Sequence, residues 1–413
     1  MKIVEVELLT VHPHIRAWNR EAHALYHDNI WETRTVIVLK TDTGLEGLAE
    51  VVGEPDQSLK NTLDRLIGTH PATWLASREI VIGLAPAIYD LVGKANDIPA
   101  YHLFGPKVRS WIPVSHWTVS QTPARMAEEV RQAAEMGHTW MKYHTCHLHN
   151  VIDQTEAMQA VAPRGFKIHY DVNFDNTVES IVGLDRALSK YPVAGLIEDP
   201  LRTHDMTGYR LLRQKCVLPI VFHHAPLGGR EVFLEAADAY MLGHADVGVT
   251  VAAAGLFEGA NVPFMTQNVG GTITQAFVAH MAAAFEMATL HHVTGAWLWE
   301  DDVVSTRFDV VGGHIRVPET PGLGIALDRD AIARLQAQTP IQLPKALARI
   351  TCQYGPVVYA RPPISRNPLW VERDVPGVGD GYERLVDQDY WYDDGSARFA
   401  DLWERAGKGV VIA

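Results

Sequence analysis

Hydrophobic and polar residues alternate along the first fifty residues in the way expected of β-strands. Residues 4–11 (VEVELLTV) show a period of two, and a second strand is expected at residues 35–40, followed by a turn at residues 41–44. Over residues 56–105 the pattern becomes helical, and it ends at the stop signal Gly105-Pro106. The pattern therefore predicts a mixed α+β unit at the amino-terminal end.

From residue 112 onward, short apolar runs alternate with helical stretches, and most of the runs end in polar residues. Eight such runs are what a (β/α)8 barrel requires, because its buried parallel strands are apolar and its active-site groups lie at their carboxyl ends. The sixth and seventh runs are unusually close together. The runs are residues 112–117, 139–144, 166–173, 195–200, 219–224, 246–251, 262–268 and 295–300.

The last hundred residues, from Arg316, return to mixed patterning. Beyond Gly355 the chain is rich in proline, glycine and aspartate, for example at residues 361–364 and 376–379. The same stretch holds too many aromatic residues for a flexible tail, so we expect an ordered but irregular extension. These aromatic residues are Trp370, Tyr390, Trp391, Tyr392 and Trp403.

The bulk composition narrows the classes of protein. The chain has 413 residues, 47% of them hydrophobic, which is enough for two domains or for one barrel with additions. A net charge of −13 argues against a nucleic-acid or anionic-membrane partner, although a local metal and a few lysines can still create a site for an anion. With three scattered cysteines, no signal-peptide pattern and no long apolar run, we expect a soluble cytoplasmic protein without a disulfide framework.

Polar side chains that could share one site follow the second to fifth runs. Lys142 and His144 end the second run, and the alternation of a strand places them on one face. Asp171 ends the third run, Glu198 the fourth and His224 the fifth. Because adjacent barrel strands end at the same rim, we expect these five side chains to lie side by side.

Two carboxylates and one imidazole are a plausible ligand set for a divalent metal. Sites built only from oxygen ligands suit Mg²⁺, whereas an imidazole such as that of His224 shifts the preference toward Mn²⁺, Fe²⁺ or Zn²⁺. A metal beside Lys142 and His144 is suited to removing a proton next to a carboxylate, because the metal neutralises the enediolate as it forms. The cation would also lower the pKa of the lysine toward the working pH.

Structural roles compete with each of these assignments. The two carboxylates could cap the helices that follow them. His144 and His224 could each be a structural histidine whose ring is satisfied by hydrogen bonds. His223 suits such a structural role better than His224. The sequence His144-x-x-His147-x-His149 could bind zinc by itself, but it lies in a loop and lacks a clear fourth ligand.

Four short segments, in a fixed order, carry a family signal. They are residues 89–105 (with YDLVGK, Pro99 and LFG), 171–173 (DVN), 197–201 (IEDPL) and 318–324 (PETPGLG). Each segment alone is weak, but together they resemble the enolase superfamily, most closely its mandelate-racemase-like members. The resemblance covers about residues 1–330. It identifies the second and third segments with metal-binding motifs at the ends of the third and fourth barrel strands.

The resemblance implies an α/β fold, in which an α+β capping domain closes a modified TIM barrel of the (β/α)7β type. The capping domain would include residues 1–112, the barrel residues 113–315, and residues 316–413 would return to the capping domain and add the extension. The resemblance implies that Asp171 and Glu198 bind Mg²⁺. The third ligand position falls on His224, which would make Mn²⁺ or another divalent metal an alternative.

Two departures from the family pattern bear on the reaction. The family's second-strand Lys-x-Lys is Lys142-x-His144 here. The histidine that the family places on the opposite face, at the end of the seventh strand, corresponds to Gln267. Its aspartate partner from the sixth strand corresponds to Val251 or the neighbouring Thr250. The opposite-face acid/base dyad is therefore expected to be missing, so that Lys142 or His144 would act from one face only.

The resemblance favours a lyase that dehydrates a sugar acid through an enediolate. Residues 12–31 and 51–55 would form substrate-specificity loops. The alternatives are a catalytically silent or repurposed barrel that binds a ligand or has a structural role, and a zinc hydrolase. We expect a small-molecule carboxylate as partner, no nucleic acid or membrane, and a homo-oligomer. The residues expected to contact substrate are Asn173, Gln267, Glu300, Arg16 and Trp18.

Overall fold

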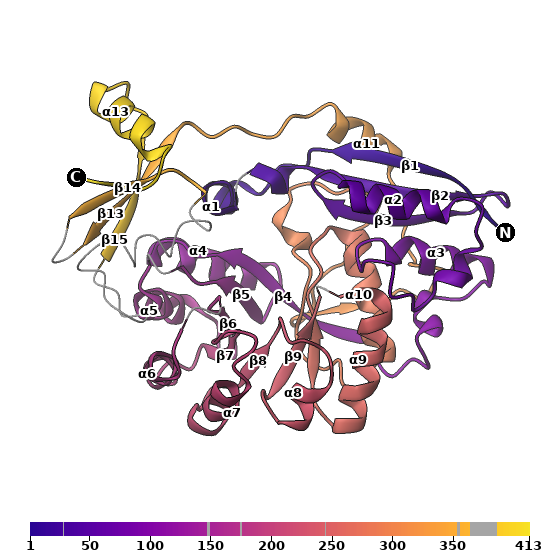
Figure 1. Ribbon diagram of the computed structural model, residues 1–413. Coiled ribbons are helices and arrows are strands. Elements are labelled where there is room, and N and C mark those ends of the chain that lie inside the picture. The colour runs from indigo at the N-terminus through magenta and orange to yellow at the C-terminus, as the bar shows by residue number, and fades with distance from the viewer. Residues whose placement is uncertain (28, 147–148, 174–175, 244, 353–355, 364–385) are drawn as a thin grey trace.

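The computed structural model describes residues 1–27, 29–146, 149–173, 176–243, 245–352, 356–363 and 386–413. They form a capping region, a barrel and a C-terminal module (Figure 1). Together the first two confirm the predicted α/β fold, a modified barrel with an α+β cap. None of the helices described is long and apolar enough to cross a bilayer. The three cysteines carry no disulfide bond.

An antiparallel sheet is the centre of the capping region, and its strands follow the order β1-β2-β3. The middle strand is buried along almost its whole length, because α3 packs against the sheet. Late in the chain α11 returns to contact β1. The elements are β1 (Ile3–Val11), α1 (Ala17–His27), η1 (Asn29–Glu32), β2 (Arg34–Thr41), β3 (Glu46–Val52), α2 (Gln57–Leu66), η2 (Pro71–Trp74), α3 (Ala85–Ala95), η3 (Ala100–Leu103) and α11 (Arg329–Gln336).

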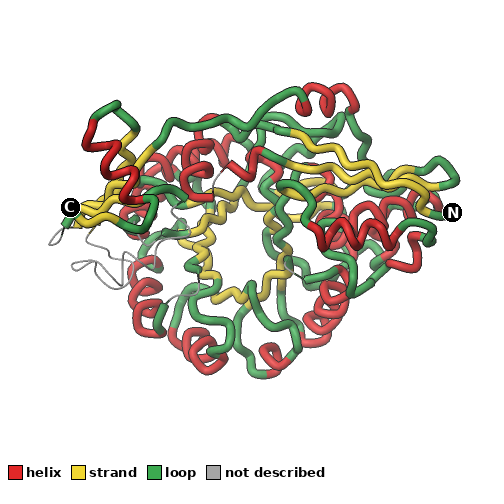
Figure 2. The backbone as a smooth tube through the Cα atoms, turned by 45° about the horizontal axis from the view of Figure 1, so that its top comes forward, coloured by secondary structure: helices red, strands yellow, loops and turns green. Residues whose placement is uncertain are grey.

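Eight parallel strands, in the order β10-β9-β8-β7-β6-β5-β4-β11, form the barrel. A bridge between Gln267 and Val293 joins the two ends of this order and closes the ring seen in Figure 2. Helices surround the ring, and the core lies between them and the strands. The strands are β4 (Trp111–Val119), β5 (Trp140–His144), β6 (Lys167–Asp171), β7 (Ala194–Glu198), β8 (Ile220–Phe222), β9 (Ala239–Leu242), β10 (Phe264–Thr266) and β11 (His292–Val293).

The helices follow the first seven barrel strands in turn, which gives the (β/α)7β pattern. After the eighth strand the chain makes a short helical turn, and β12 then pairs antiparallel with the start of β4. The elements are α4 (Pro123–Glu135), α5 (Val151–Val161), α6 (Val178–Leu188), α7 (Met206–Lys215), α8 (Arg230–Phe233), α9 (Val247–Ala260), α10 (Thr272–Ala284), η4 (Ala296–Leu298) and β12 (His314–Arg316).

Two of the eight predicted strands are wrong. The run at residues 246–251 begins the helix α9, because Asp246 caps that helix by accepting a hydrogen bond from the Val249 amide at 2.8 Å. The true sixth strand is β9, a four-residue run too short to stand out in the sequence. The run at residues 295–300 follows the eighth strand instead of forming it, because Gly295 has a φ of 72° and turns the chain into η4.

The C-terminal extension is more regular than expected. Its four strands pair in the order β15-β13-β14-β16, and α13 covers one face of this sheet. Alternation explains the two faces, since Leu347 and Tyr359 pack with α13 whereas Ala348 and Val358 join the core of the barrel mouth. Trp370 and residues 376–379 lie outside the described residues. The elements are β13 (Ala346–Cys352), β14 (Val357–Ala360), β15 (Val386–Tyr392), α13 (Ala397–Ala406) and β16 (Val411–Ile412).

Candidate active site

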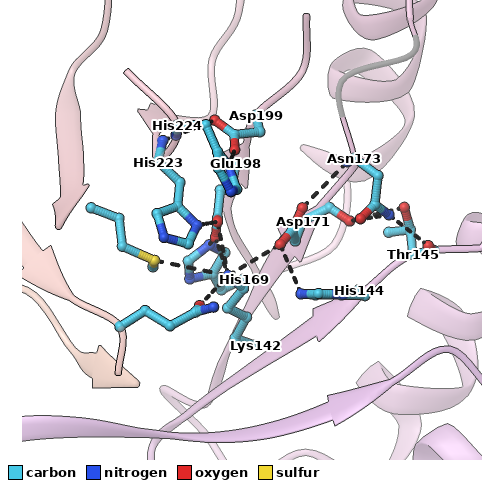
Figure 3. A network of polar contacts seen from close by, with 12 residues as sticks. Lys142, His144, Thr145, His169, Asp171, Asn173, Glu198, Asp199, His223 and His224 are labelled. Carbon is cyan, nitrogen blue, oxygen red and sulfur yellow. Dashed lines mark hydrogen bonds and ion pairs between the residues drawn. The ribbon is translucent and has the colours of Figure 1, made fainter. Parts of the chain in front are cut away.

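A cluster of charged side chains fills the carboxyl end of the barrel at β5, β6, β7 and β8 (Figure 3). The strand register creates it, because His144 lies beside Asp171, and Asp171 lies beside Glu198 on the next strand. The same register places Lys142 beside His169. Residues two apart on a strand share a face, so all of these side chains point into the barrel.

Lys142 is the permanent cation of the cluster, and its side chain is fully buried. Its Nζ lies 2.8 Å from the Glu198 carboxylate and 3.1 Å from Asp171 Oδ2. Burial alone would lower the pKa of Lys142, but the two carboxylates outweigh it and raise the pKa above its ordinary value. The cluster itself therefore works against the lowered lysine pKa expected from the sequence. Lys142 is better suited to hold charge than to accept a proton.

Glu198 is fully buried and is surrounded by donors. Besides Lys142, the Nε2 of His169 contacts one carboxylate oxygen, and the Nδ1 of His223 lies 2.8 Å from the other. Burial would raise the pKa of Glu198, but Lys142 and His169 hold it well below the usual range. The residue is thus ionised and held in one orientation.

His169 belongs to the site although the sequence reasoning missed it. Its Nδ1 lies 2.9 Å from the Nε2 of His291, and the His291 ring stacks on Trp140 with ring centroids 3.9 Å apart. Burial lowers the pKa of His169 despite the opposing charge of Glu198. A neutral His169 that donates through Nε2 to Glu198 must accept at Nδ1, so His291 is the donor of that bond. The available signal was alternation, because His169 precedes Asp171 by two residues.

Asp171 joins the cluster to the candidate base His144, whose Nε2 lies 3.1 Å from Asp171 Oδ2. Burial and Glu198 would raise the pKa of Asp171, but Lys142 and His144 bring it down to about 2. Asn173 braces this strand end in a left-handed conformation with a φ of 56°. Its amide donates to Asp171 Oδ1 at 3.3 Å, and its Nδ2 donates to the Thr145 carbonyl at 2.9 Å.

His224 does not contact Asp171 or Glu198 but pairs with Asp199, with 2.5 Å between His224 Nδ1 and Asp199 Oδ2. Asp199 is buried with a φ of 45°, and burial raises its pKa to about 6. Among the described residues, Asp199, His223 and His224 form a group of possible metal ligands, with ligand atoms within 4.8 Å of one another. The structure thus brings His223 to Glu198 and His224 to Asp199.

The donor set of the cluster fits a divalent cation. Three carboxylates, those of Asp171, Glu198 and Asp199, are buried here, and the first two contact the Lys142 ammonium. Counting the three carboxylates against the Lys142 ammonium leaves an excess of two negative charges, which a protonated imidazole such as His224, whose pKa is raised, against the effect of burial, by Asp199, offsets only in part. Buried charges must be balanced, and oxygen and imidazole ligands suit Mg²⁺ or Mn²⁺. Asp171 and Glu198 also converge on one point, since both contact the same Nζ.

The opposite side of the barrel interior carries an amide where the family places its base. The side-chain oxygen of Gln267 accepts a hydrogen bond from Lys142 Nζ at 2.5 Å. Assigning the sixth-strand position to Val251 or Thr250 is wrong, because both lie in α9, and the strand β9 leads instead to Gly243. A Cβ at Gly243 would lie 1.9 Å from the Gln267 carbonyl oxygen, so the backbone there leaves no room for an acidic side chain.

The capping-loop residues Arg16, Trp18 and Arg20 make their contacts outside the charged cluster. The Nε of Arg16 donates to the Trp297 carbonyl at 2.8 Å, and its guanidinium lies 5.3 Å from the centre of the Trp18 ring. Glu300, predicted to contact substrate or a barrel cation, pairs at 3.1 Å with Arg20 of the capping loop. Its side chain is 45% exposed, so the structure does not bring Glu300 into the cluster.

Aromatic rings cover His144 on the side of the capping loop. The ring of Trp117, at the end of β4, meets the His144 ring edge-on with centroids 5.3 Å apart. Trp31 stacks on Trp117 at 5.1 Å, and the buried His23 of α1 lies at the same distance from Trp117. The candidate base therefore has a carboxylate on one side and an aromatic wall on another.

Comparison with known proteins gives concordant matches. The sequence model of the family described as "Enolase C-terminal domain-like" matches residues 125–331. The N-succinyl-L-Arg/Lys racemase of Bacillus cereus is 26% identical over 371 residues, which cover 81% of this chain and 98% of the racemase. The D-xylonate dehydratase of Haloferax volcanii is 28% identical, and the match covers 68% of this chain and 76% of the dehydratase.

A solved structure agrees with these sequence matches. An enolase from Thermobispora bispora, complexed with magnesium and formate, superimposes with a TM-score of 0.66 at 21% identity. The match covers 82% of this chain and 93% of that enzyme. At this identity the similarity shows a shared fold.

Proposed function

The chain belongs to the enolase superfamily, in its mandelate-racemase-like branch, and on that premise we propose that it is a metal-dependent lyase that dehydrates a sugar acid through an enediolate. Members of this superfamily typically use Mg²⁺, and the relatives matched by this chain include both a racemase and a dehydratase. The choice between those two reactions depends on the residues on either side of the substrate.

We assign the metal to Asp171 and Glu198, with a third ligand from the His223–His224 pair. The two carboxylates converge, and the excess negative charge of the cluster calls for a divalent cation. Such a cation, when bound, supplies positive charge to the substrate carboxylate as it gains electron density. Lys142 adds a second, fixed positive charge beside the same point.

The observation that carries the choice of reaction is the Lys142–Gln267 contact of 2.5 Å. Racemisation by two bases needs a proton acceptor on each face of the α-carbon. Gln267 cannot act as a base near neutral pH, and its oxygen is already engaged by Lys142. We therefore assign the acid/base capacity to the His144 side, which suits a syn elimination.

His144 can carry both proton transfers of such an elimination. The His144 imidazole would take the α-proton, and Asp171, 3.1 Å from its Nε2, would stabilise the resulting imidazolium. The imidazolium would then return the proton to the β-hydroxyl group, which leaves as water when the Cβ–O bond breaks. The enol that remains tautomerises to a 2-keto-3-deoxy acid, so atoms and charges balance without a further reactant.

The capping loop supports a polyhydroxylated substrate. Arg16, Trp18 and Arg20 lie in the segment that the family uses for specificity, and their polar and aromatic groups suit hydroxyl groups better than an alkyl chain. The dehydratase from Haloferax volcanii acts on D-xylonate, which is a member of this substrate class.

A panel of sugar acids incubated with Mg²⁺ in D₂O tests the proposal, with 2-keto-acid formation as the readout. We expect one acid to lose water, and His144→Ala to lower the rate by about 10²- to 10⁴-fold. Gln267→Leu, which removes the amide but no base, should lower it much less. Deuterium at an inverted α-centre would contradict the one-face mechanism.

A silent, ligand-binding barrel is the second candidate. It is favoured by the Lys142 ammonium, which already lies at the point where Asp171 and Glu198 converge. Absence of bound Mg²⁺ or Mn²⁺ and of turnover with every acid would support it. Tightly bound zinc at Asp199, His223 and His224 would instead favour a zinc hydrolase.

A further inference from the structure

The C-terminal module lies beyond residue 331, where the family match ends. Matching 98% of the Bacillus cereus racemase requires only 81% of this chain, so part of the chain has no counterpart there. In the structure the helix α1, which belongs to the predicted specificity loop, lies between this module and the capping sheet (Figure 1). The module therefore lies against the predicted specificity loop.

The inner face of the module packs on the barrel mouth. Ile350 and Cys352 of β13 share a buried cluster with Trp117 and with Cys146, which follows β5. Ala22 of α1 packs against the same cluster. Because buried apolar contact is the main source of adhesion between such units, the module is fixed to the rim on the side of Lys142 and His144.

Polar contacts tie the same C-terminal segment to the specificity loop. Tyr392 of β15 donates its hydroxyl hydrogen to Glu21 on α1, and Glu21 also lies 3.7 Å from Arg125 of α4. The backbone amide of Ile341 donates to the buried Glu32 at 2.6 Å, just after the loop. The Tyr392–Glu21 contact thus holds α1 to the module, while His23 of α1 packs against Trp117.

We propose that the C-terminal module is a clasp that holds α1 closed over the site, with Tyr392 as a positioning residue for substrate binding. The argument follows a chain of contacts from Tyr392 to Glu21, through α1 to the His23–Trp117 pair, and from Trp117 to His144. With the clasp in place, the loop is closed before substrate arrives, so less ordering is required on binding. Loosening it should weaken substrate binding without changing the reacting groups.

Amide hydrogen exchange of the full-length protein tests the clasp directly. Tyr392→Phe keeps the ring and its packing but removes the donor, and we expect exchange of the α1 amides to rise roughly five- to tenfold. Tyr359→Phe is the matched control, because Tyr359 lies in the same sheet but faces α13. Glu21→Gln, which keeps an acceptor oxygen, should retain more protection than Glu21→Ala. Unchanged exchange in Tyr392→Phe would overturn the clasp.

The kinetic arm rests on the proposed function, whereas the exchange arm does not. With an acid that turns over, Tyr392→Phe should raise KM several-fold and leave kcat within about twofold of the wild-type value. A faster exchange together with an unchanged KM would overturn the role of Tyr392 in substrate binding. Failure to find any substrate counts against the lyase proposal, while the exchange result alone still decides whether the clasp exists.

Discussion

Two buried charge clusters occupy this molecule, and they are built on different plans. One joins the cap to the barrel, where Arg34 of β2 lies 3.3 Å from Glu50 and 2.9 Å from Asp302, with all three side chains almost fully buried. We call it the cap staple. The other is the candidate site around Lys142, Asp171 and Glu198.

The charges of the cap staple are balanced. Arg34 and Arg307 face Glu50 and Asp302, which gives two charges of each sign. Backbone amides satisfy further oxygens, from Thr272 to Asp302 and from Thr274 to Glu50, each at 2.9 Å. A balanced buried network of this kind fixes one arrangement of cap and barrel.

The site cluster has excess negative charge and relies on imidazoles that can gain or lose protons. Its third carboxylate, Asp199, has a pKa raised to about 6 by burial. The comparison teaches that burial and ion pairing do not by themselves mark a functional site. What marks the site is unbalanced charge at the carboxyl end of a barrel.

Replacing the cation of each cluster should give the largest difference. Arg34→Met leaves Glu50 buried without its cation and Asp302 with only Arg307, 3.8 Å away, so we expect a loss of about 3–5 kcal/mol in unfolding free energy, with or without Mg²⁺. Lys142→Met should also be destabilising without metal, but Mg²⁺ should restore much of its stability, because the carboxylates can bind it. Denaturant midpoints at several Mg²⁺ concentrations measure both. Rescue of Arg34→Met by Mg²⁺ would remove the distinction between the clusters.

Neutralising one carboxylate in each cluster sharpens the contrast. Glu198→Gln removes a proposed metal ligand and should weaken Mg²⁺ binding on the order of 100-fold or more, as measured by calorimetry. Asp302→Asn is the matched change in the cap staple and should leave Mg²⁺ affinity unaltered while lowering stability. Equal Mg²⁺ affinity in the wild type and Glu198→Gln would eliminate the proposed metal site.

The two clusters differ in how far the sequence predicts them. The site followed from polar residues at the ends of apolar runs, because parallel strands bring those ends together. The cap staple could not be predicted, since Arg34, Glu50 and Asp302 share no motif and only the closed fold brings them together.

Within the site, sequence reasoning placed Lys142, His144, Asp171 and Glu198 correctly on strand ends. It could not determine which of two adjacent histidines reaches Glu198, because that depends on how the chain turns after β8. It also located the sixth strand wrongly, since an apolar β-branched run can equally start a helix. The regular C-terminal sheet was missed because glycine and proline dominated the surrounding composition.

Acid should weaken both clusters, and by similar amounts. The pKa values of Asp171 and Asp302 are both lowered from 3.8 to about 2. Because its pKa is lowered in the folded state, each ionised carboxylate stabilises the protein above pH 3.8. This contribution, on the order of 2 kcal/mol for each residue, is lost as the pH falls toward 2. Asp302→Asn should therefore flatten the dependence of the denaturant midpoint on pH between about 4 and 2. In Asp302→Asn the remaining loss of stability in acid comes from Asp171, which is a proposed metal ligand. Added Mg²⁺ should therefore keep the denaturant midpoint of this variant high to a lower pH. Identical plots of midpoint against pH with and without Mg²⁺ would contradict this.

The smallest effect is expected at Glu300, which belongs to neither cluster. Its pair with Arg20 is 3.1 Å long, but the Glu300 side chain is 45% exposed, so water and salt screen the attraction. Exposed pairs of this kind contribute less than about 1 kcal/mol, and Glu300→Gln should change the denaturant midpoint very little. If Glu300 instead hydrogen-bonds the substrate, as the strand-end pattern suggested, the same variant would raise KM well beyond a few-fold while leaving stability intact. Measuring KM and the midpoint on one preparation separates the two roles, because a surface ion pair would change the midpoint slightly and leave KM unaltered.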